Sequence, residues 1–408
     1  MSPTHAQLGN RSLFPELQAR VYLAHAAVSP ISTPVQQAIE QVIHSYAQQG
    51  FGAFPQWIQQ RLTLKSTLSR LLHCQPEDLA LVQSTTSGLL AIALCVPWQA
   101  GDAIVLTEGE FPANVTPWQQ VAARFGLEIQ WLPQPLPEEM PMWLEGLRET
   151  LAQTRARVVT VSAVQFQTGL AMPLQEIGEI CHEFGAELCV DAVQAVGAVP
   201  LDLHKLPIDY LAAGAHKWMN AVEGAGFVYI SPRVVHNLRP TWAGWLSHED
   251  GLGFLLRGAG HLRHDRPIRQ SADFLEIGNV SSLSFAAMGA AADTLESLGI
   301  PEIFAHVQPI LDALENGLTA RGFVSLRARD PHLRSCTLAM RTPADVDVLD
   351  LQHQLADLGV ATSAPDGLLR LAPHWPNHLT EVPMVLAAMD KALVGMRSGK
   401  SNTLPRGS

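Results

Sequence analysis

Short apolar runs rich in β-branched residues alternate with longer helical patterns between residues 79 and 231. The runs fall at 79–83, 102–106, 127–132, 157–162, 187–191, 209–215 and 224–231. Strands that are apolar along their whole length must be covered on both faces, and their alternation with helices is typical of a mainly parallel sheet. The sequence therefore predicts an α/β fold in which ligands bind at the carboxyl ends of the strands.

The pattern changes after about residue 280. A helix of small residues leads into a long helix that ends near Arg321, and two short strands, a helix over 344–358, a strand at 368–373 and a closing helix from 379 follow. This order predicts a second, smaller α+β domain, which suits a chain of 408 residues. We expect an N-terminal arm (1–20), a large domain (21–280), a small C-terminal domain (281–396) and a disordered polar tail (397–408).

Composition excludes several classes of function. The chain carries 27 basic and 38 acidic residues, a net charge of −11, so we expect no nucleic-acid partner, because phosphate backbones require a basic face. We also expect a cytoplasmic protein without a membrane segment, because no run of about 18 apolar residues and no signal-peptide pattern occurs. The five cysteines are scattered and form no CxxC pair, so neither a disulfide framework nor a metal site is expected.

Two of the predicted strand ends carry an acid and a lysine. Asp191 ends the run 187–191, and Lys217 follows the run 209–215, between small residues, a histidine and a tryptophan. This pair suits pyridoxal 5′-phosphate (PLP), because the lysine can hold the cofactor aldehyde as a Schiff base while the acid keeps the pyridine nitrogen protonated. A strand-end salt bridge or cap explains either residue alone, whereas the pair favours a PLP site.

A third strand end, in QSTTSGLLA (83–91), carries hydroxyl groups and opens a helix. Free amides at a helix N-terminus and the hydroxyls of Thr85, Thr86 and Ser87 would form a cradle for a phosphate. An ordinary Ser/Thr helix cap explains the same residues. A lysine suited to PLP elsewhere in the chain favours the phosphate interpretation.

An arginine lies in the short apolar run of GLLRLAPHWPN (367–377). A buried guanidinium such as that of Arg370 needs an anionic partner, and its planar fork fits a carboxylate with two parallel hydrogen bonds. The partner is either a ligand carboxylate or a carboxylate of the protein itself.

The segments VDAVQ (190–194) and AHKW (215–218) are the most specific parts of a wider resemblance, over about residues 21–395. The chain resembles the class V aminotransferases, a family of fold-type I PLP enzymes that includes cysteine desulfurases, kynureninases and isopenicillin N epimerase-like proteins. The resemblance implies a mainly parallel seven-stranded sheet, a smaller α+β domain, PLP as cofactor, an amino-acid substrate and a homodimer with the active site at the subunit interface.

The resemblance also implies roles for individual residues. Lys217 would be the catalytic Schiff-base lysine, Asp191 the partner of the ring nitrogen and Gln194 a donor to the ring's phenolic oxygen. Further cofactor contacts would come from Thr86, Ser87 and His216, from Phe111 stacked on the ring, and from Asn279 of a neighbouring subunit. Substrate contacts would come from Arg370, which would hold the α-carboxylate, and from Gln165 (or Gln167) and Trp245.

Two departures from the desulfurases affect the expected reaction. Phe111 stands where desulfurases carry a histidine, and the loop GVATSAPDGLLR (359–370) contains no cysteine that could carry a persulfide. We therefore expect a transaminase-like reaction, with a carbon–sulfur lyase or an epimerase as the alternative.

Three further alternatives follow from the sequence. A non-catalytic PLP-binding module is disfavoured by the presence of Lys217, Asp191 and Arg370 together. A nucleotide-dependent enzyme is disfavoured because neither GxGxxG nor GxxxxGK[ST] occurs. The arginine-rich segment 257–270 would either attract an acidic substrate group or form a solvated surface loop.

Overall fold

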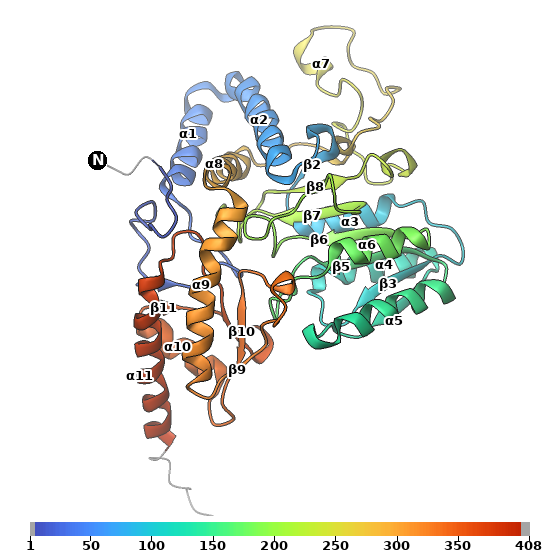
Figure 1. Cartoon of the computed structure of the whole chain (residues 1–408). Coiled ribbons are helices and arrows are strands. Elements are labelled where there is room, and N and C mark those ends of the chain that lie inside the picture. The colour runs from blue at the N-terminus through green and yellow to red at the C-terminus, as the bar shows by residue number, and fades with distance from the viewer. Residues whose placement is uncertain (1–4, 401–408) are drawn as a thin grey trace, which may run out of the picture.

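A seven-stranded sheet organises the chain. A computed structural model describes the backbone of residues 5–400 and the side chains of residues 5–396. The strands hydrogen-bond in the order β2-β8-β7-β6-β5-β3-β4 (Figure 1). Their bounds are β2 (Leu79–Val82), β3 (Ala103–Thr107), β4 (Glu128–Leu132), β5 (Ala156–Ser162), β6 (Glu187–Asp191), β7 (Tyr210–Gly214) and β8 (Gly226–Ile230). The strands from β7 to β4 pair in parallel and β8 is antiparallel to both neighbours, so the predicted α/β fold is confirmed.

The strand register places three strand ends at one level. Ser162 pairs with Asp191, and Asp191 pairs with Ala212. Lys217 follows the end of β7 by three residues. The carboxyl ends of β5, β6 and β7 therefore meet at one edge of the sheet, where ligands of such folds bind.

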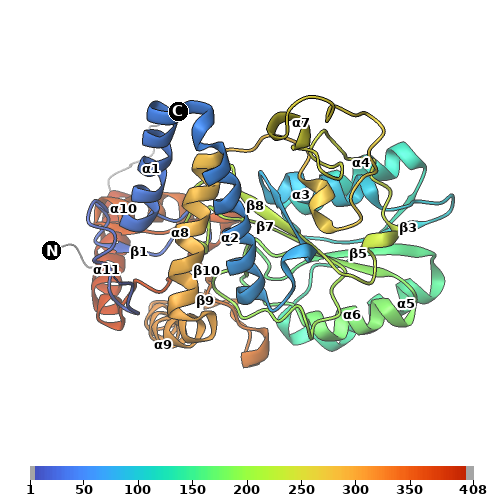
Figure 2. The ribbon, with the colours of Figure 1, turned by 90° about the horizontal axis from the view of Figure 1, so that it is seen from above.

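Helices cover both faces of the sheet. The helices α3 (Thr85–Cys95) and α4 (Thr116–Phe125) lie on one side, and α5 (Met140–Gln153) and α6 (Leu174–Glu183) lie on the other (Figure 2). On β3, Ile104 packs in the core with Leu89 of α3, whereas the next residue, Val105, packs in the core with Leu147 of α5. This alternation explains why the strands are apolar throughout.

The remaining elements form a helical layer and a smaller unit. The helices α1 (Thr33–Gln49) and α2 (Phe54–Leu72) pack against α8 (Ser282–Leu298), and α7 (Gly253–Leu256) lies in a loop that projects from the body (Figure 1). The smaller unit contains α9 (Ile300–Thr319), α10 (Val348–Asp357), α11 (Val382–Lys400) and a sheet of β9 (Val324–Ser325), β10 (Leu338–Arg341) and β12 (Leu369–Leu371). Short 3-10 helices connect these elements: η1 (Gly50–Ala53), η2 (Pro76–Asp78), η3 (Pro112–Asn114), η4 (Pro137–Glu139), η5 (Val235–Asn237), η6 (Ala272–Leu275), η7 (Pro331–Leu333), η8 (Pro365–Gly367) and η9 (Leu379–Glu381).

The N-terminal segment joins the smaller unit. The two-residue strand β1 (Val21–Tyr22) pairs in parallel with β11 (Val360–Ala361), and Val21 and Leu23 pack in the same core as α9 and α11. The domain boundaries inferred from the sequence stay predictions, and the predicted tail lies, from residue 401 on, outside the described residues.

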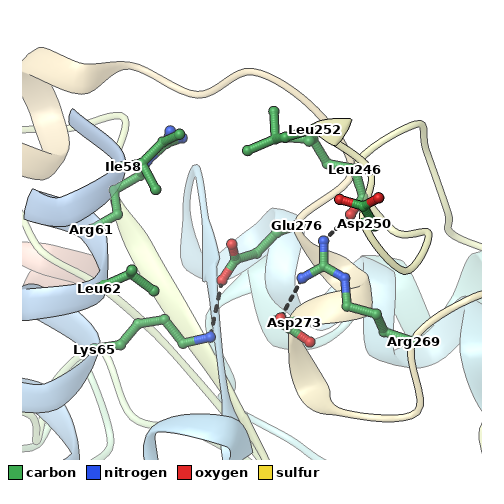
Figure 3. Close-up of a pocket in the computed structure, with 11 residues that line it drawn as sticks. Ile58, Arg61, Leu62, Lys65, Leu246, Asp250, Leu252, Arg269, Asp273 and Glu276 are labelled. Carbon is green, nitrogen blue, oxygen red and sulfur yellow. Dashed lines mark hydrogen bonds and ion pairs between the residues drawn. The ribbon is translucent and has the colours of Figure 1, made fainter. Parts of the chain in front are cut away.

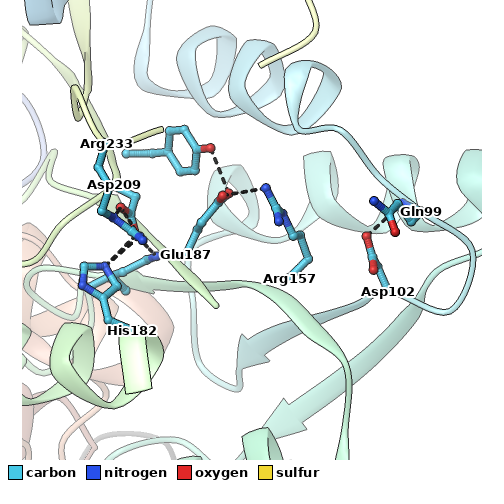
Figure 4. Close-up of polar contacts among 9 residues, drawn as sticks. Gln99, Asp102, Arg157, His182, Glu187, Asp209 and Arg233 are labelled. Atoms are coloured by element: carbon cyan, nitrogen blue, oxygen red, sulfur yellow. Dashed lines mark hydrogen bonds and ion pairs between the residues drawn. The ribbon is translucent and has the colours of Figure 1, made fainter. Parts of the chain in front are cut away.

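The opposite edge of the sheet carries a network of ion pairs (Figure 4). Glu187, at the start of β6, accepts hydrogen bonds from Arg157 at 2.7 Å and from the Tyr210 hydroxyl at 2.9 Å. Asp209 pairs with Arg233 at 2.5 Å and accepts a hydrogen bond from the backbone N–H of Leu188 at 2.8 Å. These contacts satisfy buried carboxylates at the amino ends of β6 and β7.

Within the described part of the chain, no helix has the length and apolar character that a membrane crossing requires.

Candidate active site

Asp191 and Lys217 lie close enough to change each other's protonation. The Asp191 side chain is buried, and its Oδ1 accepts a hydrogen bond from the Val193 N–H at 3.0 Å. Burial raises the pKa of Asp191 to about 7, and the Lys217 charge opposes this shift. Burial lowers the pKa of Lys217 to about 8, against the opposing charge of Asp191. The predicted pair is therefore brought together, and neither group points into bulk water.

Arg370 reaches the same site from the smaller unit. It lies on β12 and is buried, with Nη1 donating to the Phe166 carbonyl oxygen at 2.6 Å and Nε to the Ser363 hydroxyl at 3.0 Å. Burial lowers the pKa of Arg370 to about 10, and the guanidinium charge contributes to the lowered pKa of Lys217. Among the described residues no carboxylate forms an ion pair with Arg370, so the alternative of an internal ion pair is not found. The structure leaves this guanidinium for an external anion.

Phe111 lies beside the lysine amine. The Lys217 Nζ is 5.5 Å from the centroid of the Phe111 ring, and Phe166 contacts that ring edge-on at 5.3 Å. The Phe111 side chain is 43% exposed, which is unusual for a core phenylalanine. Its exposed surface is available to a planar ligand.

The N-terminus of α3 contains both a helix cap and an unpaired hydroxyl. The Ser84 hydroxyl accepts a hydrogen bond from the Ser87 N–H, and the Ser87 hydroxyl donates to the Ser84 carbonyl oxygen, so Ser87 acts in a cap. Thr86 is exposed. Thr85, in contrast, is buried, and its Oγ1 has no hydrogen-bond partner in the protein. A Cβ added at Gly214 would lie 3.1 Å from this oxygen, so the glycine keeps the space beside it open.

Gln194 and His216 are fixed by the N-terminal segment. Gln194 Nε2 donates to the Ala26 carbonyl oxygen at 2.9 Å, and its Oε1 accepts a hydrogen bond from the Trp218 Nε1 at 2.8 Å. One N–H of the Gln194 amide remains for a ligand. The His216 carbonyl oxygen accepts a hydrogen bond from the Ser29 N–H at 2.9 Å, and burial lowers the pKa of its imidazole.

The other predicted contacts lie in different surroundings. Gln165 is buried, its Nε2 donates to Glu110 at 3.1 Å, and its Oε1 has no hydrogen-bond partner. Gln167 instead links Gln134 to the loop after β11. Asn279 is exposed between η6 and α8, and Trp245 is 39% exposed beside the projecting loop.

The arginine-rich segment is largely neutralised. Its four arginines each pair with an aspartate: Arg257 and Arg266 with Asp250, Arg263 with Asp265, and Arg269 with Asp273. This pairing favours the surface-loop interpretation over an attractor for acidic substrates.

A separate hollow of about 380 Å³ lies between α2 and the segment 246–276 (Figure 3). Lys65 pairs there with Glu276 at 3.4 Å, and Arg269 pairs with Asp273. None of the predicted site residues is among the residues that line it, so this hollow is distinct from the site around Lys217.

The sequence interpretation assigned no role to Glu110, which lies between β3 and Phe111 and accepts four hydrogen bonds in the site. An acidic residue three positions after the fully buried strand β3 was the available signal, because strand ends of this sheet carry the site.

Comparison with known families identifies the family of this chain. The family model for aminotransferase class-V matches residues 21–369. The chain belongs to this family. Its members are PLP-dependent enzymes that act on amino acids, and the architecture is that of fold-type I PLP enzymes. The predicted family, fold type and enzyme class are thereby confirmed.

Relatives within the family differ in activity. The uncharacterized aminotransferase YcbU of Bacillus subtilis (strain 168) is 26% identical over 373 residues, covering 91% of this chain and 94% of the relative. Isopenicillin N epimerase of Streptomyces clavuligerus is 27% identical over 338 residues, covering 81% and 84%. A solved structure of a C-DES mutant, with glycine covalently linked to the PLP cofactor, has a TM-score of 0.80 at 21% identity and covers 93% of this chain and 98% of that chain. The likeness to the solved structure shows the fold.

The residues present fit PLP on two structural counts. The Thr85 hydroxyl is buried without a protein partner next to a helix N-terminus, which is where a phosphate would satisfy it. Asp191 is a buried acid that forms no ion pair with any described residue, and a protonated ring nitrogen would supply its counter-charge.

Proposed function

We propose that the protein is a PLP-dependent enzyme that acts on an amino acid in a transaminase-type reaction. The observation that carries this proposal is the convergence of Lys217, Asp191 and Arg370, from three separate elements, at the carboxyl edge of the sheet. PLP, when bound, supplies an electron sink for charge that develops on the substrate α-carbon.

The three residues have complementary tasks. Lys217 would hold the cofactor aldehyde, and its free amine would accept the proton from the substrate α-carbon. A pKa near 8 suits this task, because a base is most effective when its pKa lies close to the working pH. Asp191 holds a proton on the ring nitrogen. Arg370 binds the α-carboxylate, and its contacts with Phe166 and Ser363 fix the orientation of the guanidinium.

The remaining predicted residues would bind and orient the cofactor. Phe111 would stack on one face of the ring, and Gln194 would donate its remaining N–H to the phenolic oxygen. The phosphate would be held at the α3 N-terminus by Thr86, Ser87 and His216, and by the hydroxyl of Thr85, which has no partner in the protein. Gln165 and Trp245 would lie toward the substrate.

We also propose a homodimer in which Asn279 reaches the phosphate bound by its neighbour. Exposed apolar side chains on α1, η1 and α2, among them Tyr46, Phe51 and Leu62, support a protein-covered face. Mixing Asn279→Ala with Lys217→Ala chains would test this arrangement, because a hybrid dimer would contain one intact site. Sedimentation and recovered PLP binding would report it.

A carbon–sulfur lyase or an epimerase is the second candidate, because both reactions also begin with removal of the α-proton. A persulfide mechanism is disfavoured. Cys336 is buried, its thiol donates to the Ala198 carbonyl oxygen at 3.3 Å, and burial raises its pKa. Of the other cysteines, Cys74 is half-buried and Cys95, Cys181 and Cys189 are buried.

Two measurements test the proposal. Protein mixed with PLP should develop a visible absorbance band, and borohydride should fix the cofactor to Lys217, as mass spectrometry of the peptide would show. Lys217→Ala should lose both the band and turnover. A panel of amino acids assayed for keto acid, sulfide and racemised product would then assign the reaction, and an unmodified Lys217 would contradict the proposal.

A further inference from the structure

Glu110 is a polar residue of the site that the proposed roles leave unused. Its Oε1 accepts hydrogen bonds from the Ser162 N–H at 2.7 Å and from Gln165 Nε2 at 3.1 Å. Its Oε2 accepts from the Ser162 hydroxyl and from Asn114 Nδ2 at 3.3 Å. Four donors on two oxygens match an ionised carboxylate, which accepts and does not donate.

Neutral groups alone hold this anion. No lysine, arginine or histidine of the described residues forms an ion pair with Glu110. Buried anions without a cation are costly unless they are well hydrogen-bonded. Burial raises the pKa of the Glu110 carboxyl group, and the hydrogen bonds from Ser162, Asn114 and Gln165 oppose that rise. These four bonds favour the ionised form, whose negative charge acts on its surroundings.

The charge lies next to the reaction site. Ser162, which donates twice to Glu110, is paired in register with Asp191 on the adjacent strand. The pKa of Asp191 is raised first by burial and further by the Glu110 charge, with Lys217 in opposition. The other titratable groups at this edge are His216 after β7 and Arg370 on β12. The site therefore contains two carboxylates, Glu110 and Asp191, and neither forms an ion pair with a described residue.

The same hydrogen bonds hold the loop that carries Phe111. Asn114 is buried, and its Oδ1 accepts from Thr160 Oγ1 at 2.6 Å and from Trp118 Nε1 at 3.3 Å. Because two donors contact Oδ1, the Asn114 amide is held in the orientation that turns its Nδ2 toward Glu110. The residue before Phe111 is thus attached to β5 through Ser162 and to η3 through Asn114.

We propose that Glu110 is a positioning residue that holds the Phe111 loop against β5 and supplies a second negative charge that stabilises positive charge on the group bound between Lys217 and Asp191. This inference rests on the proposed PLP function. It assigns the carboxylate a part in setting the proton affinity of the bound cofactor, in addition to its part in the fold.

The test is a pH titration of the visible absorbance band in PLP-loaded protein. Glu110→Gln removes the charge, and its amide can keep the bonds to Ser162 and Gln165. A unit charge about 10 Å away, at an effective dielectric of about 20, shifts a pKa by about one unit. The midpoint of the band should fall by about one unit, because loss of the negative charge favours the unprotonated form.

Two controls separate charge from hydrogen bonding. Glu108→Gln removes an equal charge from an exposed side chain two residues away and should leave the midpoint within about 0.2 units, because solvent screens surface charges. Ser162→Ala keeps the carboxyl group but removes the hydroxyl bond that most lowers the pKa of Glu110, so its midpoint should fall by less than that of Glu110→Gln.

The possible outcomes separate a failure of the proposed role of Glu110 from a failure of the proposed PLP function. Wild-type protein that never develops the band would contradict the proposed function. A wild-type band with an unchanged midpoint in folded Glu110→Gln would overturn the role of Glu110. If Glu110→Gln does not fold, Glu110→Ala removes the same charge with a smaller side chain and leaves room for water to satisfy the four donors. A lowered midpoint in that variant supports the inference, and an unchanged one refutes it.

Discussion

Lys217 should capture an aldehyde at neutral pH much faster than an ordinary lysine does. Only the unprotonated amine is a nucleophile, and burial, with a contribution from the Arg370 charge and against that of Asp191, lowers the pKa of Lys217 to about 8. The rate at which the apoprotein binds PLP should therefore follow the titration of this one amine.

The pKa gives the size of the effect. With a pKa of about 8, roughly one tenth of the amine is unprotonated at pH 7, half at pH 8 and about nine tenths at pH 9. The capture rate should therefore rise about tenfold between pH 7 and pH 9 and then level off. A lysine with the usual pKa of about 10.4 would gain about a hundredfold over the same interval without levelling off.

Stopped-flow absorbance of apoprotein mixed with PLP measures this rate. Lys217→Ala gives the background from surface lysines, and a soluble lysine derivative corrects for titration of PLP itself. Asp191→Asn should move the midpoint below about 8, because the Asp191 charge raises the pKa of Lys217. A hundredfold rise with no plateau, or no effect of Asp191→Asn, would refute the reasoning.

Three further substitutions test separate parts of the structure. Arg370→Lys keeps the charge and loses the planar fork, so kcat/KM for an amino acid should fall at least about tenfold relative to the matching amine without a carboxylate, and equal losses for both would count against carboxylate binding. Thr85→Val removes a hydroxyl that has no protein partner, so the free energy of unfolding of the apoprotein should not fall, while PLP should dissociate about tenfold to a hundredfold more readily in equilibrium dialysis; unchanged PLP affinity would remove Thr85 from the phosphate site. Tyr210→Phe removes the buried hydrogen bond to Glu187 and should lower the free energy of unfolding in urea by about 1–2 kcal/mol, and no change would show that Arg157 alone satisfies Glu187.

Sequence periodicity was sufficient for the sheet and for the residues at its strand ends. Asp191 ends the buried strand β6, and Lys217 lies three residues after the buried strand β7, so both polar side chains stand out against apolar runs. The end of the sheet on which they lie follows from the rule for parallel strands. Local signals of this kind need no knowledge of how distant segments pack.

Contacts between distant segments were beyond the sequence. Arg370 donates to Phe166, 204 positions away, and this contact exists because β12 of the smaller unit packs against the loop after β5. The sequence also could not show which hydroxyl at the N-terminus of α3 is free of hydrogen bonds within the protein. Ser84, Thr85 and Ser87 are chemically alike, and only the three-dimensional cap shows that Ser87 is engaged while the Thr85 hydroxyl is unpaired.

Element boundaries shifted where a side chain competes with the backbone. The helix predicted over 344–358 begins at Val348, because the Asp347 carboxylate accepts hydrogen bonds from the N–H groups of Leu349 and Asp350 and caps the helix there.

Ser29 donates a hydrogen bond to the His216 carbonyl oxygen, and the Ala26 carbonyl oxygen accepts one from Gln194. The N-terminal segment therefore helps to hold the residues around Lys217 in place. A protease cut near residue 30 would remove supports on both sides of a lysine that lies almost two hundred positions further along. Damage at the N-terminus would then first become visible as a fading yellow colour rather than as unfolding.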